Sequence, residues 1–282
     1  MEPDSLRHVT LRDGATMPRL GFGVFQVPPE QAVDAVATAL GAGYRLIDTA
    51  AAYRNEREVG EAVRASGLDR GEVFVTTKCS NADQGYDEAR RAFRESHARL
   101  DLGPVDLYLI HWPVPQRDRF VDTWRAFVEL ADEGLVRSIG VSNFRPQDLE
   151  RVIDATGVVP AVNQIELHPR MQQAALRALH AELGIVTEAW SSLGRGTVLD
   201  DPVIVAIARR LGRTPAQVVI RWHLQLGNAV LAKSVTPQRI SENIDVLDFA
   251  LSEEDLAAIA QLEAATRVGP DPDTFFQPPQ PH

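Results

Sequence analysis

The feature that most constrains the fold is a short apolar run, preceded by Gly and ended by a polar or aromatic residue, that recurs along the chain. The runs read GAGYRLID, GEVFVTTK, GPVDLYLIH, GLVRSIGVSN, GVVPAVNQ, GIVTEAW and GNAVLAKS. They are rich in Val, Ile and Leu, which is typical of parallel strands buried on both faces. Their ends fall at residues 48, 78, 111, 142, 164, 190 and 233. This spacing is that of strand-plus-helix units.

The segments between these runs carry apolar residues at helical spacing, and Gly before each run is typical of a helix end. A first strand over residues 19–23 brings the number of units to eight. Because the alternation never breaks for a second domain, it favours a closed (β/α)8 barrel, a TIM barrel, over an open doubly wound sheet. We therefore expect one barrel domain over residues 1–282.

Three further segments are predicted around this barrel. Residues 8–18, with Asp13-Gly14 at the turn, predict an N-terminal β-hairpin. Residues 202–211 and 215–226 predict two consecutive helices, the second opened by Thr214-Pro215. The Pro-rich tail from about residue 268 predicts an extended coil over the surface.

Composition excludes several classes of function. A net charge of -10 argues against nucleic acid or an anionic membrane as the main partner. Cys79 is the single cysteine, so no intrachain disulfide forms, and no His/Cys cluster has metal-ligand spacing, so no metal is expected. With neither a signal-peptide pattern nor about 18 consecutive apolar residues, the chain is expected to be cytoplasmic.

Three ionisable residues stand at the ends of three consecutive predicted strands: Asp48, Lys78 and His111. The C-terminal ends of barrel strands carry function, and neighbouring strands lie roughly 4.8 Å apart, so Lys78 can contact Asp48 and approach His111. Tyr53 follows in the loop after Asp48, where an adjacent ammonium would lower the pKa of its phenol. A structural ion pair or a core histidine would explain one such residue alone. The set together favours a catalytic site with a tuned proton donor.

The motifs IDTAAAYRNE, TTK, LIHWP, GVSNF, VNQIELHP and KSVTPQRISENI resemble those of the aldo-keto reductase superfamily. TPAQVVIRWHLQ and VVPAVNQIELHP are similar to its bacterial 2,5-diketo-D-gluconate reductase branch. The resemblance covers about residues 8 to 265 in the family's motif order. It implies a (β/α)8 barrel that binds NADPH in an extended form and reduces small aldehydes and ketones, among them keto-sugar acids or 2-oxo compounds.

The resemblance also implies roles for individual residues. Tyr53 resembles the general acid that protonates the carbonyl oxygen. By the same match Lys78 lowers the pKa of Tyr53, Asp48 pairs with Lys78, and His111 orients the carbonyl.

The cofactor residues implied in the same way fall into three groups along the dinucleotide. Gly23, Ser142, Asn143, Gln164 and Trp190 match positions around the nicotinamide. The pyrophosphate loop would consist of Ser191, Leu193, Gly194 and Gly196, and the 2′-phosphate and adenine end of Lys233, Ser234, Val235, Arg239, Glu242 and Asn243.

The substrate side departs from the family pattern. Relatives often have Leu-Trp-Asn after the catalytic lysine, where this chain has Cys79-Ser80-Asn81, so one aromatic wall is expected to be missing. Phe25 and Trp112 are the aromatic residues that we expect near the substrate. Two alternatives compete with a carbonyl reductase: a nucleotide-binding regulatory or structural protein on the same barrel, and a phosphate-handling barrel isomerase. The expected partner is a small carbonyl compound and the expected oligomeric state is a monomer.

Overall fold

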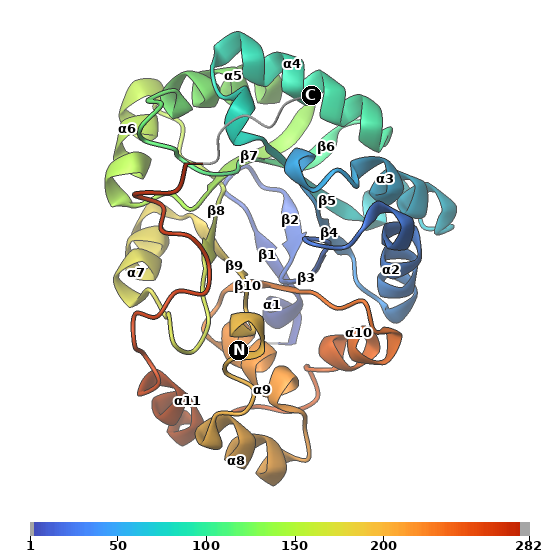
Figure 1. Cartoon of the computed structure of the whole chain (residues 1–282), viewed down its shortest axis with the longest axis vertical. Coiled ribbons are helices and arrows are strands. Elements are labelled where there is room, and N and C mark those ends of the chain that lie inside the picture. The colour runs from blue at the N-terminus through green and yellow to red at the C-terminus, as the bar shows by residue number, and fades with distance from the viewer. Residues whose placement is uncertain (1–2, 277–282) are drawn as a thin grey trace.

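A closed barrel of eight parallel strands forms the centre of the molecule (Figure 1). The computed structural model describes residues 3–276. Going round the barrel, the strands follow the order β10-β3-β4-β5-β6-β7-β8-β9. Their bounds are β3 (Leu20–Gly23), β4 (Leu46–Asp48), β5 (Phe74–Cys79), β6 (Val105–Ile110), β7 (Val136–Ser142), β8 (Val162–Glu166), β9 (Val186–Trp190) and β10 (Ala229–Ala232). The predicted fold class is confirmed.

Helices surround the barrel and connect its strands (Figure 1). The α-helices are α1 (Pro3–Arg7), α2 (Pro29–Ala42), α3 (Glu56–Ala65), α4 (Tyr86–Leu100), α5 (Phe120–Asp132), α6 (Pro146–Thr156), α7 (Ala174–Leu183), α8 (Pro202–Leu211), α9 (Pro215–Gln225), α10 (Pro237–Ile244) and α11 (Glu253–Ala260). Four short 3-10 helices join them: η1 (Ala51–Tyr53), η2 (Arg70–Glu72), η3 (Asn81–Asp83) and η4 (Gly194–Gly196). The predicted pair of helices, α8 and α9, is confirmed.

Local sequence signals explain where these helices begin and end. Thr214 caps α9, its side chain accepting from the backbone N–H of Gln217 at 3.2 Å while the Gln217 side chain accepts from Thr214 N–H. This reciprocal pair satisfies two N–H groups that the helix leaves free. Gly43 ends α2 with φ at 107°, a left-handed conformation that costs glycine little.

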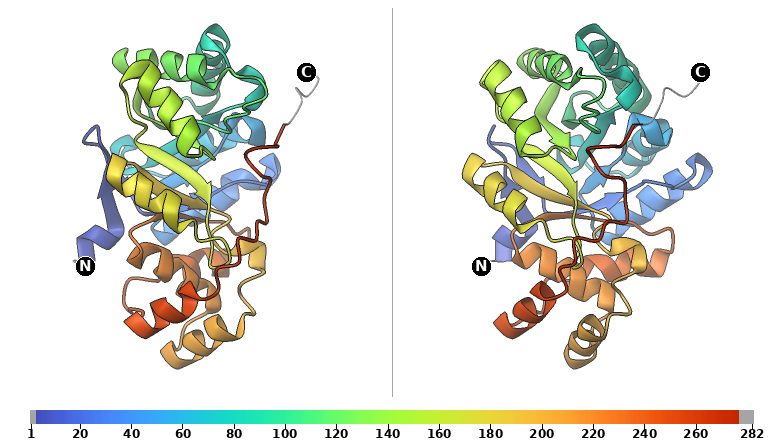
Figure 2. Two further views of the ribbon diagram at one scale, coloured as in Figure 1. Left: turned by 90° about the vertical axis from the view of Figure 1, so that its left-hand side faces the viewer. Right: turned by 60° about the vertical axis from the view of Figure 1, so that its left-hand side comes forward.

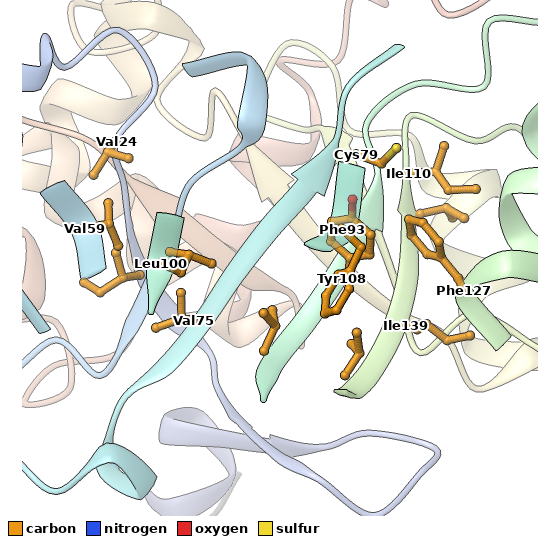
Figure 3. Packing of buried hydrophobic residues seen from close by; sticks show 14 of the residues in the cluster. Val24, Val59, Val75, Cys79, Phe93, Leu100, Tyr108, Ile110, Phe127 and Ile139 are labelled. Atoms are coloured by element: carbon orange, nitrogen blue, oxygen red, sulfur yellow. The ribbon is translucent and has the colours of Figure 1, made fainter. Parts of the chain in front are cut away.

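The apolar residues form two layers, one outside and one inside the barrel. Outside, Tyr108 stacks on Phe127 at 4.4 Å between ring centroids and contacts Phe93 edge-on, filling the space between β6 and its helices (Figure 3). Inside, Leu46, Phe74, Leu107, Leu109 and Leu231 belong to a separate buried cluster. The interior is narrow, because a Cβ on Gly21 would lie 2.7 Å from the side chains of Leu46 and Leu231.

The predicted hairpin and tail lie at opposite ends of the barrel (Figure 2). Strands β1 (His8–Thr10) and β2 (Thr16–Pro18) pair antiparallel, which confirms the hairpin, and Leu11 and Met17 pack into the inner cluster. At the other end, residues 269–276 form no helix or strand, as predicted. The rest of the expected coil, residues 277–282, lies outside the described residues. Within residues 3–276 no helix combines the length and apolarity needed to cross a bilayer.

Candidate active site

The predicted ion pair lies buried at the C-terminal end of the barrel strands. Lys78 and Asp48 are 0% and 3% exposed, and Lys78 Nζ donates to both Asp48 carboxylate oxygens at 2.7 Å. A third bond runs from Nζ to the backbone oxygen of Thr49 at 2.9 Å. All three ammonium hydrogens therefore have acceptors. Gly23 ends the neighbouring strand and pairs in register with Asp48, which places it at the same mouth.

Tyr53 and His111 meet above this ion pair. Tyr53 ends η1, and Lys78 Nζ lies 5.1 Å from the centroid of its ring. The Tyr53 and His111 rings meet edge-on with centroids 5.6 Å apart. The structure therefore brings all four predicted catalytic residues together.

The direction of the Tyr53 pKa corrects one expectation. Burial raises the pKa of the phenol, the Lys78 ammonium lowers it, and the Asp48 carboxylate raises it again. The net result is a raised pKa, whereas the sequence led us to expect a lowered one. The Lys78 ammonium acts in the expected direction. Desolvation of the phenolate outweighs its attraction to Lys78, because Asp48 neutralises much of the ammonium charge.

His111 and Lys78 hold opposite charge states at neutral pH. Burial, with a smaller contribution from Lys78, lowers the pKa of His111 to about 3, so the imidazole is neutral. Burial lowers the pKa of Lys78, but the attraction of Asp48, Tyr53 and Glu188 outweighs it and the pKa is raised. The site therefore keeps its ammonium and presents an uncharged imidazole.

The four predicted nicotinamide residues of β7 to β9 form one hydrogen-bonded group. Ser142 Oγ donates to the backbone oxygen of Gln164 at 2.8 Å, and Asn143 Nδ2 donates to Ser142 Oγ at 3.0 Å. Trp190 Nε1 donates to Asn143 Oδ1 at 2.8 Å. Asn143 also donates to the backbone oxygen of His111 and has φ at 65°. These bonds fix the polar side chains and the indole beside the residues predicted to be catalytic.

The predicted pyrophosphate loop follows β9 directly. Gly194 N–H donates to the oxygen of Ser191 at 2.7 Å, and Gly196 N–H to that of Leu193 at 2.8 Å. Ser191, Gly194 and Gly196 all have positive φ, at 48°, 55° and 93°. The loop is tightly turned, as close backbone approach to a phosphate requires.

The residues predicted for the 2′-phosphate and adenine follow β10. Lys233 and Arg239 are exposed, as is Val235, and within residues 3–276 neither cation forms an ion pair. Lys233 lies one residue beyond the strand. Ser234 Oγ accepts from Thr236 N–H at 3.0 Å. The last two residues predicted here are on α10, where Glu242 is partly exposed and Asn243 is buried.

These groups fit a dinucleotide phosphate. Two exposed cations that pair with no carboxylate of residues 3–276 suit a phosphate monoester, because each can donate charge-assisted hydrogen bonds. Trp190, at the end of β9, is partly exposed, and its hydrogen bond to Asn143 fixes its orientation. Such a ring can stack on a planar heterocycle.

The substrate side combines aromatic residues with the C-terminal tail. Phe25 is 46% exposed and lies 5.1 Å from Tyr53 between ring centroids. Trp112 is buried between Trp190 at 6.0 Å and Phe275 of the tail at 4.5 Å. Phe25 thus lies against Tyr53, whereas Trp112 packs between Trp190 and Phe275, which adds a third ring.

The segment Cys79-Ser80-Asn81 supplies no aromatic ring at this place. The Cys79 thiol is buried, and burial raises its pKa to about 12. The Ser80 side chain caps η3 by accepting from Ala82 N–H, and Asn81 is buried. Burial and a raised pKa are typical of an unreactive cysteine with a packing role.

Two buried acids near the site were not predicted. Glu166 accepts from the N–H groups of Val268 and Gly269, fixing the tail above the indole of Trp190. Glu188 accepts from Gln164 inside the barrel. Alternation along the strand could have predicted the position of Glu188, because residues two apart lie on the same face and Trp190 is two residues further on. Within residues 3–276 no cluster of three or more His, Cys, Asp or Glu side chains could hold a metal ion.

The structure is a (β/α)8 barrel that holds Tyr, Lys, His and Asp at its mouth. Two exposed cations, Lys233 and Arg239, follow β10 beside this site. Together these features define a class of oxidoreductase. The family model described as the aldo/keto reductase family matches residues 19–264. The chain belongs to this family.

Close relatives cover nearly the whole chain. An aldo-keto reductase of Mycolicibacterium smegmatis is 58% identical over 267 residues, 95% of this chain and 97% of the relative. The methylglyoxal reductase DkgA of Escherichia coli is 51% identical over 269 residues, again 95% and 97%. A crystal structure of a Gox0644 mutant in complex with NADPH superposes with a TM-score of 0.92 at 50% identity, covering 96% of this chain and 98% of that one. The expected family is confirmed.

Proposed function

We propose that the protein reduces small aldehydes and ketones to alcohols, with Tyr53 as the general acid. The observation that supports this most directly is the buried ion pair of Lys78 and Asp48 placed beneath the rings of Tyr53 and His111. A merely structural ion pair would not need a phenol and a neutral imidazole held over it at a solvent-accessible mouth. This combination suits proton transfer to a carbonyl oxygen.

The chain is an NADPH-dependent oxidoreductase, as its family and the NADPH complex of its structural relative establish. When bound, NADPH supplies the hydride for the carbonyl carbon. Lys233, Ser234 and Arg239 would hold the 2′-phosphate, and the loop from Ser191 to Gly196 the pyrophosphate. Val235, Glu242 and Asn243 would complete the adenine end. Ser142, Asn143, Gln164 and Trp190 would orient the nicotinamide next to Gly23.

Each catalytic residue has one role in the proposed reaction. The Tyr53 phenol donates its proton to the carbonyl oxygen as negative charge develops there. Lys78 stabilises the phenolate that remains, and Asp48 keeps the ammonium in place. His111, being neutral, donates a hydrogen bond to the carbonyl oxygen without competing as an acid.

The substrate class follows from the shape of the mouth. Phe25 packs against Tyr53, and Trp112, which follows His111 in the chain, packs against Phe275, so aromatic rings bound part of this mouth and suit a short molecule. The E. coli relative is named for methylglyoxal, a 2-oxoaldehyde. We propose 2-oxoaldehydes and other 2-oxo compounds, including keto-sugar acids, as substrates of a monomeric, single-domain cytoplasmic enzyme.

The test is the substitution Tyr53→Phe, which keeps the ring and removes the proton. We expect methylglyoxal reduction to fall by roughly 10²- to 10⁴-fold, the usual contribution of general acid catalysis, with NADPH affinity nearly unchanged. Steady-state rates and a fluorescence titration of NADPH measure both parts.

As a control, Tyr86→Phe removes an exposed phenol hydroxyl on α4 and should leave both quantities unchanged. Activity of Tyr53→Phe within about threefold of wild type would refute Tyr53 as the acid. Wild-type protein that binds NADPH but reduces no aldehyde would favour the regulatory alternative.

A further inference from the structure

Glu188 is a buried acid inside the barrel for which the proposed reaction has no role. It lies in the middle of β9, is 0% exposed and pairs in register with Gln164 of β8 and Ala229 of β10. Its Oε2 accepts from Gln164 Nε2 at 2.7 Å. Its Oε1 accepts no hydrogen bond from residues 3–276. Burying a carboxyl group is costly, so a functional reason for its presence is worth seeking.

The amide of Gln164 lies between two carboxyl groups. Its Nε2 is 2.7 Å from Glu188 Oε2 and 2.8 Å from Asp48 Oδ2. A primary amide nitrogen has two hydrogens, so both are used by these two acceptors. The carbonyl oxygen cannot occupy this place, because it would face two further acceptors. It is therefore the group that Gln164 has left for a ligand.

Asp48 alone would orient this amide poorly. Asp48 Oδ2 also accepts from Lys78 Nζ at 2.7 Å, and the Asp48 carboxylate is committed to that ammonium. Without Glu188, one amide hydrogen would have no acceptor inside the barrel, and rotation of the amide by 180° would become less costly. Glu188 thus determines which end of the amide faces away from the barrel interior.

We propose that Glu188 is a positioning residue that fixes the Gln164 amide so that its carbonyl oxygen accepts a hydrogen bond from the carboxamide N–H of the nicotinamide. This inference rests on the proposed role of Gln164 at the nicotinamide. Glu188 would act on the cofactor indirectly, through the orientation of the Gln164 amide.

The protonation state of Glu188 decides how well it performs this role. Burial and the Asp48 carboxylate raise the pKa of Glu188, the Gln164 hydrogen bond and Lys78 lower it, and the net pKa is about 7. Asp48 of β4 and Lys78 of β5 are the charged groups that face it, whereas β8 and β10 contribute Gln164 and Ala229. Only the carboxylate is a pure acceptor. A protonated Glu188 can donate to the Gln164 carbonyl and so favours the rotated amide.

The experiment compares two ligands that differ only at the carboxamide. NADP⁺ has the amide N–H donors, and 3-acetylpyridine adenine dinucleotide phosphate replaces the amino group by a methyl group. Quenching of tryptophan fluorescence gives Kd for both, and the ratio of the two Kd values measures the carboxamide hydrogen bond. Wild type, Glu188→Gln, Glu188→Leu and Gln164→Ala are compared. Asp106→Asn, which neutralises a buried carboxylate at the start of β6, is the matched control.

We expect wild type to bind NADP⁺ about three- to tenfold more tightly than the analogue, the usual range for one hydrogen bond. This ratio should fall toward one in Gln164→Ala and in both Glu188 variants, and stay at the wild-type value in Asp106→Asn. In wild type it should also fall between pH 8 and pH 5.5, but not in Glu188→Gln. The wild-type pH series remains decisive if a Glu188 variant fails to fold.

The proposed roles of Glu188 and Gln164 can be refuted separately. A wild-type ratio in the Glu188 variants, with a ratio near one in Gln164→Ala, would overturn the role of Glu188 and leave that of Gln164 intact. An unchanged ratio in Gln164→Ala would overturn the proposed role of Gln164 and the inference with it. A wild-type ratio that is independent of pH would contradict the role of the ionised carboxylate.

Discussion

The buried position 78 suits a lysine and not an arginine. The chain has 27 arginines but only two lysines, Lys78 and Lys233. Lys78 is fully buried, and its three hydrogens meet two oxygens of Asp48 and one of Thr49. A guanidinium is wider and planar, and it prefers bidentate partners in one plane. The space and the acceptors around Nζ suit a point charge on a slim stem.

We therefore predict that Lys78→Arg folds but loses most of its activity. Overpacking a buried site typically costs about 1–3 kcal/mol of stability, and displacement of Tyr53 should lower kcat/KM by roughly 100-fold or more. Urea denaturation and aldehyde reduction measure the two effects. Lys78→Met is the contrast, because it leaves Asp48 charged and unpaired and should cost about 3–5 kcal/mol. Lys78→Arg with near wild-type turnover would show that charge alone is required.

At the scale of elements, we propose that the connection from β10 to α10 selects NADPH over NADH. It places Lys233 just after the strand and Arg239 in the first turns of the helix, both exposed. Neither is neutralised by a carboxylate within the described residues, unlike Arg210 and Arg213, which pair with Asp255, Asp245 and Asp248. A cation that is free of an acidic partner is available to a phosphate.

We predict that Arg239→Ala weakens NADPH binding about 10- to 100-fold and changes NADH binding little, because only NADPH carries the 2′-phosphate. Kd values for both cofactors at low and high salt measure this, and salt should weaken NADPH binding more. Arg209→Ala, which removes an exposed charge at the end of α8, is the control. Undiminished preference for NADPH in Arg239→Ala would contradict the assignment.

At the scale of the whole molecule, the buried carboxyl group of Glu188 makes the stability of the fold depend on pH. Burial raises the pKa of Glu188 to about 7, from an ordinary value of 4.5. The folded state therefore holds this proton more tightly than the unfolded state does. Its contribution to stability is complete below about pH 4.5 and is lost as the pH rises through about 7.

We predict that Glu188→Gln, which cannot titrate, gains stability relative to wild type as the pH rises. The difference in free energy of unfolding should grow by up to about 3 kcal/mol between pH 4.5 and pH 8. Urea denaturation of both proteins across this range measures it. Parallel curves for the two proteins would show that Glu188 ionises in the folded state as readily as in the unfolded state.

The barrel and the positions of the proposed catalytic residues could be predicted because both depend on local sequence patterns. A Gly, an apolar run and a polar end repeat seven times after a first strand over residues 19–23, and this spacing permits few other folds. Alternation along the strands places Asp48, Lys78 and His111 at one mouth. The tail was predicted only as a coil, since its contacts with Glu166 and Trp112 join residues more than 100 positions apart.

The sequence by itself thus determined the eight-unit barrel, its hairpin, and the meeting of Asp48, Tyr53, Lys78 and His111, because local periodicity and strand polarity suffice for these. Only the tertiary structure decided the direction of the Tyr53 pKa and the place of Glu188 beside Gln164. Both depend on how far neighbouring strands exclude water and how close two carboxyl groups come across the barrel. Desolvation and charge pairing act through space between elements distant in sequence, and no local pattern records their sum.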